Sequence, residues 1–206
     1  MFIRYLWDNP TLFFMQIWVV VFSICCHEFM HAWAALKQGD STAADLGHLT
    51  LNPFKQMRGF SLVMLFFIGL AWGMVPVNPS RMRHRWSSAL VSFAGPATNL
   101  ALFLLSGIAA GVNARYFGNT NVSKLFLIGG MINMILFIIN MIPVPGFDGW
   151  NIATFFFPKL QSGGSELRTG AGLALIIGIF LFIEQISNFG LEATRWIGGQ
   201  VLNLLS

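Results

Sequence analysis

The side chains best suited to chemistry are two imidazoles and a carboxylate in the stretch His27-Glu28-x-x-His31. They follow a run, residues 10–26, that is uncharged and mostly apolar. On a helix, His27 and His31 lie four residues apart and share a face. Both rings can then bind one metal ion, with Glu28 beside them to act on a metal-held water molecule. Titratable groups in such apolar sequence are costly unless bound, so the pattern predicts a metal site.

A third ligand is expected, because catalytic zinc sites usually have three protein ligands and one open position. The best candidate is Asp148, the only acidic residue between Asp45 and Glu166. Prolines and glycines surround it at the end of an apolar run, and such irregular backbone is tolerated in a membrane only where protein or water covers it. An aspartate that caps a turn is the alternative. The incomplete two-histidine site favours the ligand role.

The composition is that of a polytopic membrane protein. Of 206 residues, 55% are hydrophobic and 10% are charged, and the mean hydropathy is +0.67. Too few charges remain to cover a soluble globule, and several apolar runs could span a bilayer. The formal charge of +4 does not indicate nucleic-acid binding, because the basic residues are scattered or lie in one short loop. Membrane topology explains that distribution better.

Two further features are given structural interpretations. Cys25 and Cys26 are adjacent within an apolar run, and we expect small buried apolar side chains there. A zinc ligand from either is disfavoured, because each points away from the face shared by the two histidines. The first apolar run is too long for a signal peptide and lacks a cleavage pattern, so it is expected to be a retained span.

The chain is expected to be an all-α membrane protein. Four apolar runs predict full transmembrane helices, at residues 12–34, 88–112, 125–142 and 167–186. We expect a single domain over residues 1–206, with a catalytic core at about 12–155 and a C-terminal helix and tail at 156–206.

Two segments outside these spans carry further expectations. Residues 47–52 alternate like a short strand, predicting a β-element on the cytoplasmic side. His48 within it either approaches the metal or makes a structural hydrogen bond, and the second is favoured. The tail, residues 187–206, fits equally an amphipathic helix at the membrane interface and a helix packed against the bundle.

The third ligand constrains the topology. If residues 60–77 crossed the membrane, strict alternation of the spans would leave Asp148 on the face opposite His31. A re-entrant hairpin at 60–77, covered by protein, removes this conflict. The same face then carries four basic or titratable residues, Arg81, Arg83, His84 and Arg85. The positive-inside rule assigns that face to the cytoplasm, so we expect both termini outside and the metal near the cytoplasmic side of the cell membrane.

The motifs resemble those of the site-2 protease family of intramembrane zinc metalloproteases. The resemblance covers roughly residues 15–155 and looks closest to the short bacterial and archaeal branch, which has neither a PDZ nor a CBS domain. Four motifs carry it: His27-Glu28-x-x-His31, residues 47–53, Gly95-Pro96-x-x-Asn99, and Asn140-x-x-Pro143-x-Pro145-x-x-Asp148-Gly149.

The resemblance implies one zinc ion held by His27, His31 and Asp148, with Glu28 as catalytic residue and Asn140 near the substrate backbone. It also implies cleavage of a transmembrane-helix protein substrate within the lipid bilayer. Zinc would lower the pKa of its bound water toward ~7. Glu28 would take the proton and return it to the leaving amine.

Two other classes of function remain as alternatives. A membrane metal transporter also needs intramembrane His and Asp residues, but it would need a polar path across the whole bilayer. A non-catalytic regulator that binds membrane helices would not need the base Glu28. The oligomeric state is left open by the sequence.

Overall fold

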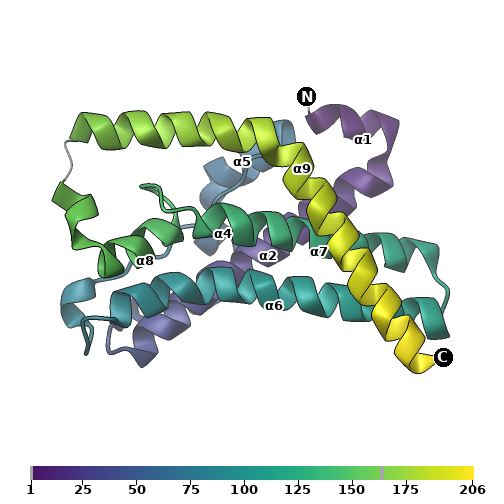
Figure 1. The fold of residues 1–206 in the computed structure, drawn as a ribbon, viewed down its shortest axis with the longest axis horizontal. Coiled ribbons are helices and arrows are strands. Elements are labelled where there is room, and N and C mark those ends of the chain that lie inside the picture. The colour runs from purple at the N-terminus through teal and green to yellow at the C-terminus, as the bar shows by residue number, and fades with distance from the viewer. Residues whose placement is uncertain (1, 163–164) are drawn as a thin grey trace.

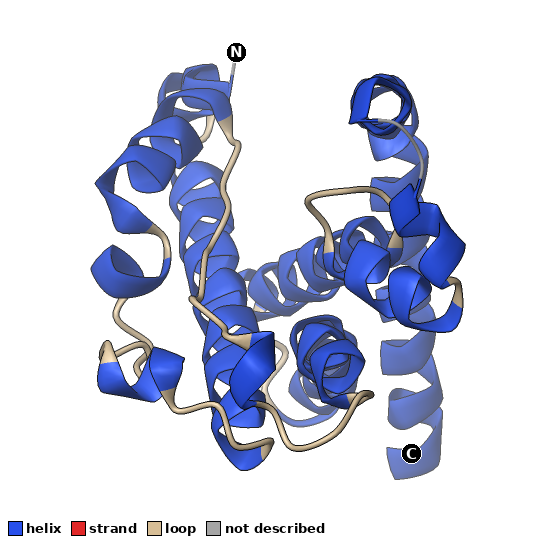
Figure 2. Ribbon diagram, turned by 90° about the vertical axis from the view of Figure 1, so that its left-hand side faces the viewer, coloured by secondary structure: helices blue, strands red, loops and turns tan. Residues whose placement is uncertain are grey.

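The computed structural model describes the backbone of residues 2–162 and 165–206, and the side chains outside 161–180. Every regular element in this part of the chain is helical (Figure 2). The α-helices are α1 (Tyr5–Asp8), α2 (Pro10–Lys37), α3 (Thr42–Asp45), α4 (Pro53–Gln56), α5 (Arg58–Ile68), α6 (Ser87–Tyr116), α7 (Thr120–Met141), α8 (Asp148–Phe156) and α9 (Ser165–Leu205). Short 3-10 helices cover Phe2–Arg4, Pro79–Arg81 and Pro158–Ser162.

Among the described residues, three helices, α2, α6 and α7, are long and apolar enough to cross a membrane. α2 begins at Pro10, where the Asn9 side chain accepts the Leu12 N–H at 3.0 Å and proline suits the first helical position. Its 28 residues give a length of about 42 Å. These helices correspond to the first three spans predicted from the sequence, and the chain is a membrane protein.

The three long helices run in alternating directions, so one end of the bundle collects the end of α2, the start of α6 and the end of α7 (Figure 1). His31, late in α2, lies 2.7 Å from the carbonyl oxygen of Val91, early in α6. Asn99 of α6 donates to Asn133 of α7 at 3.0 Å. All the polar groups discussed below lie at or near this end.

The connection from α2 to α6 leaves and returns at that same end. The Arg83 N–H donates to the Gln38 carbonyl at 2.9 Å, and the Met74 N–H donates to the Gln56 carbonyl at 3.0 Å. α5 has 11 residues, about 16 Å of helix, which is shorter than the ~30 Å hydrocarbon core. The two ends of this connection therefore lie together, as the predicted hairpin requires, while its re-entry into a membrane stays a prediction.

The predicted β-element at residues 47–52 is wrong. This segment is irregular in the structure. The side chain of Gln56 donates to the carbonyl oxygens of His48 and Thr50, at 2.8 and 2.6 Å. The alternating pattern had no neighbouring strand with which to pair, and a single buried amide satisfies the backbone instead.

The C-terminal tail is part of a longer helix than expected. α9 continues to Leu205 for 41 residues and changes direction along its length (Figure 1). Its second half packs on the bundle, which is one of the two alternatives for the tail. The fourth predicted span, 167–186, falls largely where side chains lie outside the described residues, and it stays a prediction.

Glycines permit this close approach. A Cβ at Gly111 of α6 would lie 2.7 Å from Val201 Cβ of α9, and one at Gly130 of α7 would meet Thr194. Small residues allow helices to pack closely where lipid provides no hydrophobic driving force. The second half of α9 is therefore held by close packing against the glycines of α6 and α7.

A buried carboxylate ties the end of α2 to the chain that returns before α6. Asp40 is fully buried. Its oxygens accept from the Thr42 N–H at 3.0 Å, from the Thr42 hydroxyl and from the Asn78 N–H at 2.6 Å. Burial acts to raise the pKa of Asp40, but these hydrogen bonds and the positive charge of Arg81 outweigh it and hold the pKa below its ordinary value.

We expect Asp40→Asn to lower the melting temperature of the detergent-purified protein at neutral pH. Hydrogen bonds to a charged group are worth about 1.5–3 kcal/mol. Because the folded-state pKa is depressed, this stability is present above the unfolded-state pKa of ~4 and is lost as pH falls through the lower folded value. The difference in melting temperature between wild type and Asp40→Asn should shrink below pH ~4. A constant difference would contradict the ionised role.

We expect Gly111→Val to destabilise the protein by about 1–3 kcal/mol, because the added carbons collide with α9. Gly199→Val is the matched control, since a Cβ at Gly199 has no neighbour within 4 Å. Thermal unfolding in detergent compares the two. Equal stability of the two variants would show that α9 is not packed as described.

Candidate metal centre

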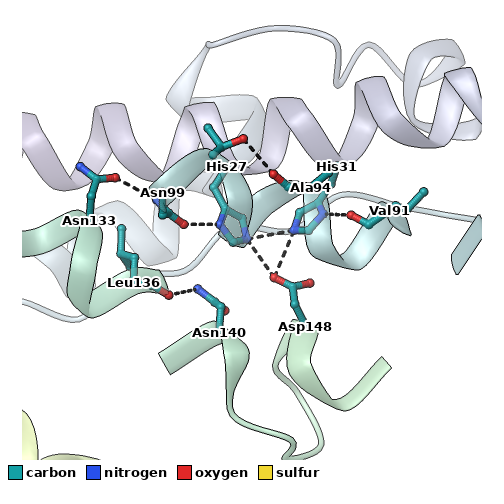
Figure 3. A network of polar contacts seen from close by, with 10 residues as sticks. His27, His31, Val91, Ala94, Asn99, Asn133, Leu136, Asn140 and Asp148 are labelled. Atoms are coloured by element: carbon teal, nitrogen blue, oxygen red, sulfur yellow. Dashed lines mark hydrogen bonds and ion pairs between the residues drawn. The ribbon is translucent and has the colours of Figure 1, made fainter. Parts of the chain in front are cut away.

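Three side chains from two distant parts of the chain converge on one point (Figure 3). The Nε2 atoms of His27 and His31 lie 2.9 Å apart. One carboxylate oxygen of Asp148 lies 3.1 Å from His27 Nε2 and 3.3 Å from His31 Nε2. Both histidines are buried, and Asp148 is partly buried. The sequence predicted this set as the metal ligands, and the structure brings all three together.

Local chain geometry aims Asp148 at the histidines. α7 ends at Met141, before the proline-containing turn, and Gly146 in that turn adopts a positive φ of 102°. Asp148 is the first residue of α8. A Cβ at Gly149 would overlap the carbonyl of Met141, so only glycine lets α8 start this close to the end of α7. The Pro/Gly-rich sequence therefore positions the carboxylate.

Each imidazole is held by its other nitrogen. His27 Nδ1 lies 2.6 Å from Asn99 Oδ1, and His31 Nδ1 lies 2.7 Å from the Val91 carbonyl oxygen. Carbonyl oxygens only accept, so both Nδ1 atoms carry the hydrogen and donate it. Both Nε2 atoms then present lone pairs to Asp148. Metal-ligating histidines typically donate their other ring N–H to an oxygen acceptor in this way.

The donor set fits zinc. Two lone-pair nitrogens and a carboxylate oxygen within 3.3 Å of one another would repel without a cation between them. Tetrahedral zinc with bonds of ~2.0–2.1 Å separates neighbouring ligand atoms by about 3.3 Å, close to the distances observed here. His27, His31 and Asp148 are therefore suited to hold one zinc ion and to leave its fourth position open.

A cavity of about 570 Å³ gives access to these groups. Glu28 lies in its wall and is 7% exposed. The extended segment 70–77, the long loop alongside α2 in Figure 2, also lines this cavity. A Cβ at Gly73 of that segment would overlap the Glu28 carboxyl group, so glycine allows the backbone to pass directly over it.

Asn140 lines the same cavity, near the end of α7. Its side-chain nitrogen donates to the Leu136 carbonyl oxygen at 2.9 Å (Figure 3). This bond uses one of the two amide hydrogens, which leaves the second hydrogen and the oxygen able to bind a substrate. The structure thus brings Asn140 to the cavity without directing it at the metal ligands.

Other titratable residues lie away from the ligands. His48 Nδ1 lies 3.4 Å from Gln56 Oε1, in keeping with the structural role favoured above. Cys25 is buried in an apolar cluster with Ile24, Met57 and Leu65. Among the described residues, neither cysteine joins the metal-binding group.

Sequence reasoning missed several residues that build the site. No role was given to Asn99 or to the Val91 carbonyl, which orient the two imidazoles, nor to Gly95. A Cβ at Gly95 would overlap both imidazole rings, so α6 can cover the histidines only with glycine there. The motif Gly95-Pro96-x-x-Asn99 was the available signal, because its glycine and its asparagine both face the site.

Comparison with known proteins agrees with this geometry. Residues 15–114 match Peptidase family M50. "Putative zinc metalloprotease YwhC" of Bacillus subtilis is 30% identical over 194 residues, covering 90% of this chain and 88% of that protein. Rip2 of Mycolicibacterium smegmatis, which carries the same descriptive name, is 33% identical over 186 residues, covering 84% of this chain and 69% of that protein. No solved structure matches the chain.

The metal-ligand geometry and these relatives define the class of protein: it is a zinc metalloprotease with apolar helices suited to a membrane. The chain belongs to peptidase family M50, the site-2 protease family. The resemblance seen in the sequence motifs is confirmed, and so is the assignment to enzymes that hydrolyse peptide bonds.

We expect Gly95→Ala to weaken zinc binding by at least 10-fold, because the new methyl group displaces the imidazoles. Gly59→Ala is the control, since a Cβ there has no neighbour within 4 Å. Zinc content after dialysis against a graded chelator series measures the effect. Wild-type zinc retention by Gly95→Ala would contradict the close packing of α6 on the histidines.

Proposed function

We propose that this protein is an intramembrane zinc metalloendopeptidase that hydrolyses a peptide bond within or near the transmembrane helix of a membrane-protein substrate. The observation that carries the proposal is the meeting of His27, His31 and Asp148 beside Glu28 in one cavity. α2 supplies His27, Glu28 and His31, and α6 covers the two histidines. Both are long apolar helices. A substrate in the same bilayer can therefore reach the site from the side.

Each side chain has a distinct role in this proposal. Zinc, when bound to His27, His31 and Asp148, supplies a Lewis acid that activates water and polarises the scissile carbonyl. Glu28 is the general base, taking a proton from the attacking water and returning it to the leaving amine. Asn140 holds the substrate backbone through its free amide hydrogen and oxygen. Exclusion of bulk water by the surrounding helices strengthens each of these polar interactions.

A helical substrate must unwind before it is cut, because its scissile carbonyl is already hydrogen-bonded within the helix. Segment 70–77 supports binding of the unwound chain. Trp72 exchanges hydrogen bonds with the Ser61 hydroxyl at 2.7 and 2.9 Å, and Met74 donates to Gln56. In an extended chain, alternate residues face opposite edges. Trp72 and Met74 bond toward Ser61 and Gln56, so the main-chain groups of Ala71, Gly73 and Val75 form the other edge of a segment that lines the cavity.

That edge can add an extended peptide by main-chain hydrogen bonds. Residues 47–52 are less suited to this role, because the Gln56 side chain already binds the carbonyl oxygens of His48 and Thr50. An incoming backbone on this edge would lie in the cavity that Glu28 and Asp148 also line. The proposal therefore accounts for the placement of a glycine directly over the catalytic glutamate.

We further propose that the site faces the cytoplasmic side of the cell membrane and that residues 1–206 form one domain. Arg81, Arg83 and Arg85 lie at the end of the bundle that holds the site, and the positive-inside rule favours the cytoplasm for them. A transporter is not favoured, because among the described residues the buried acidic and histidine side chains, His27, Glu28, His31 and Asp40, lie at one end of the bundle. A binding-only regulator would have no use for Glu28.

We expect Glu28→Gln to abolish cleavage while zinc content stays near the wild-type level, because Glu28 is a base and not a ligand. The assay incubates detergent-purified protein with a reporter substrate that has a single transmembrane helix, with and without chelator. Wild-type activity should vanish with chelator and return with added zinc. Cleavage by zinc-loaded Glu28→Gln would overturn the role of Glu28, and chelator-resistant cleavage would overturn the metal mechanism.

A further inference from the structure

A chain of buried amides links His27 to the main chain of α7. His27 Nδ1 contacts Asn99 Oδ1 at 2.6 Å, and Asn99 Nδ2 donates to Asn133 Oδ1 at 3.0 Å (Figure 3). Asn133 Nδ2 then donates to the Gly129 carbonyl oxygen at 2.8 Å and to Ser23 Oγ at 2.9 Å. Asn99 is fully buried, and Asn133 is 3% exposed. None of the roles assigned above involves Asn133.

The donor-to-acceptor direction of these amide hydrogen bonds is fixed at the Gly129 end. The Gly129 carbonyl oxygen can only accept, so the NH2 group of Asn133 must face it, and the oxygen of Asn133 must face Asn99. Asn99 must then present its own NH2 group to Asn133 and its oxygen to His27. The Ser23 hydroxyl can donate or accept, so it does not set the direction.

Reversing both amides would be costly. The Asn133 oxygen would then lie about where its nitrogen now lies, 2.8 Å from the Gly129 carbonyl oxygen, and two acceptors at that distance repel. A reversed Asn99 would offer its NH2 group to His27 Nδ1. The imidazole could then accept that bond only by moving its own hydrogen to Nε2, the nitrogen that faces Asp148.

We propose that Asn133 is a positioning residue for zinc, acting through Asn99 to fix the tautomer of His27 that leaves Nε2 free to bind the metal. This inference rests on the proposed metal site. It extends the site to a residue in α7 that does not touch the ligands. His31 needs no such relay, because its Nδ1 donates to the Val91 main-chain carbonyl, which cannot be reversed.

Three variants test the direction of the relay in the full-length, detergent-purified protein. Asn133→Leu removes the anchor and frees Asn99 to reverse. Asn99→Asp replaces the amide with a carboxylate, which accepts with both oxygens when ionised. The double variant carries both changes and can accept from His27 whichever way the carboxylate turns.

Two readouts are taken, zinc affinity by chelator competition and the tautomer of each histidine by nitrogen-15 NMR. We expect Asn133→Leu to weaken zinc binding by about 10–100-fold. The Nδ1–H signal of His27 should diminish while that of His31 is unchanged. Asn99→Asp and the double variant should bind zinc within a few-fold of wild type. A merely structural role for Asn133 would not be rescued by a carboxylate at position 99.

The outcomes separate the relay from the proposed function. Wild-type zinc affinity in Asn133→Leu, or a double variant as weak as Asn133→Leu, would overturn the relay while leaving zinc-dependent cleavage by the wild type intact. A wild-type protein that binds no zinc would overturn both. If Asn133→Leu does not fold, Asn133→Ala takes its place, with and without Asn99→Asp, and the loss of zinc affinity must again be reversed by the carboxylate at position 99.

Discussion

The structure depends on the need to pair every buried polar group at one end of an apolar helical bundle. Two imidazoles and a carboxylate share a point within about 3 Å. Unpaired, they would each cost several kcal/mol in such surroundings. A cation between the Nε2 atoms and the Asp148 oxygen resolves that conflict, and the main-chain and asparagine acceptors behind the imidazoles complete it. Local features, from the glycine in α6 to the turn before α8, serve this convergence.

The chain path follows from the same constraint. α2 and Asp148 supply ligands from well-separated parts of the sequence, so the intervening chain must cross the bundle an even number of times. α6 and α7 make those two crossings, whereas α5 runs toward the start of α2, where Phe66 packs on Phe13, and the extended segment 70–77 brings the chain back. The extended chain after α5 then lies over Glu28, which gives the site a backbone edge in place of a side-chain wall. The fold and the access route to the metal thus have a common origin.

The ligand set could be predicted because the signal for each ligand lies in the residues next to it in the sequence. His27 and His31 share a helical face by periodicity, and Asp148 was isolated among apolar residues with a helix-breaking turn before it. The return of segment 60–77 followed from requiring these groups to meet. The strand at 47–52 was wrong because alternation does not report whether a partner strand exists. The reach of the Gln56 side chain to those carbonyls is a tertiary contact that no local pattern contains.

The contact between Asn99 and Asn133 behind the ligands could not be predicted, because it too is a tertiary contact. Asn99 and Asn133 lie on different helices, and only the packing of α6 on α7 brings their amides into one chain. The most direct test of the centre is X-ray absorption spectroscopy of the zinc-loaded protein. We expect two imidazole nitrogens and carboxylate oxygen at ~2.0–2.2 Å, with no sulfur ligand. A zinc–sulfur distance of ~2.3 Å would contradict the account. So would a spectrum of Asp148→Ala in which zinc has lost only a water ligand and no carboxylate ligand.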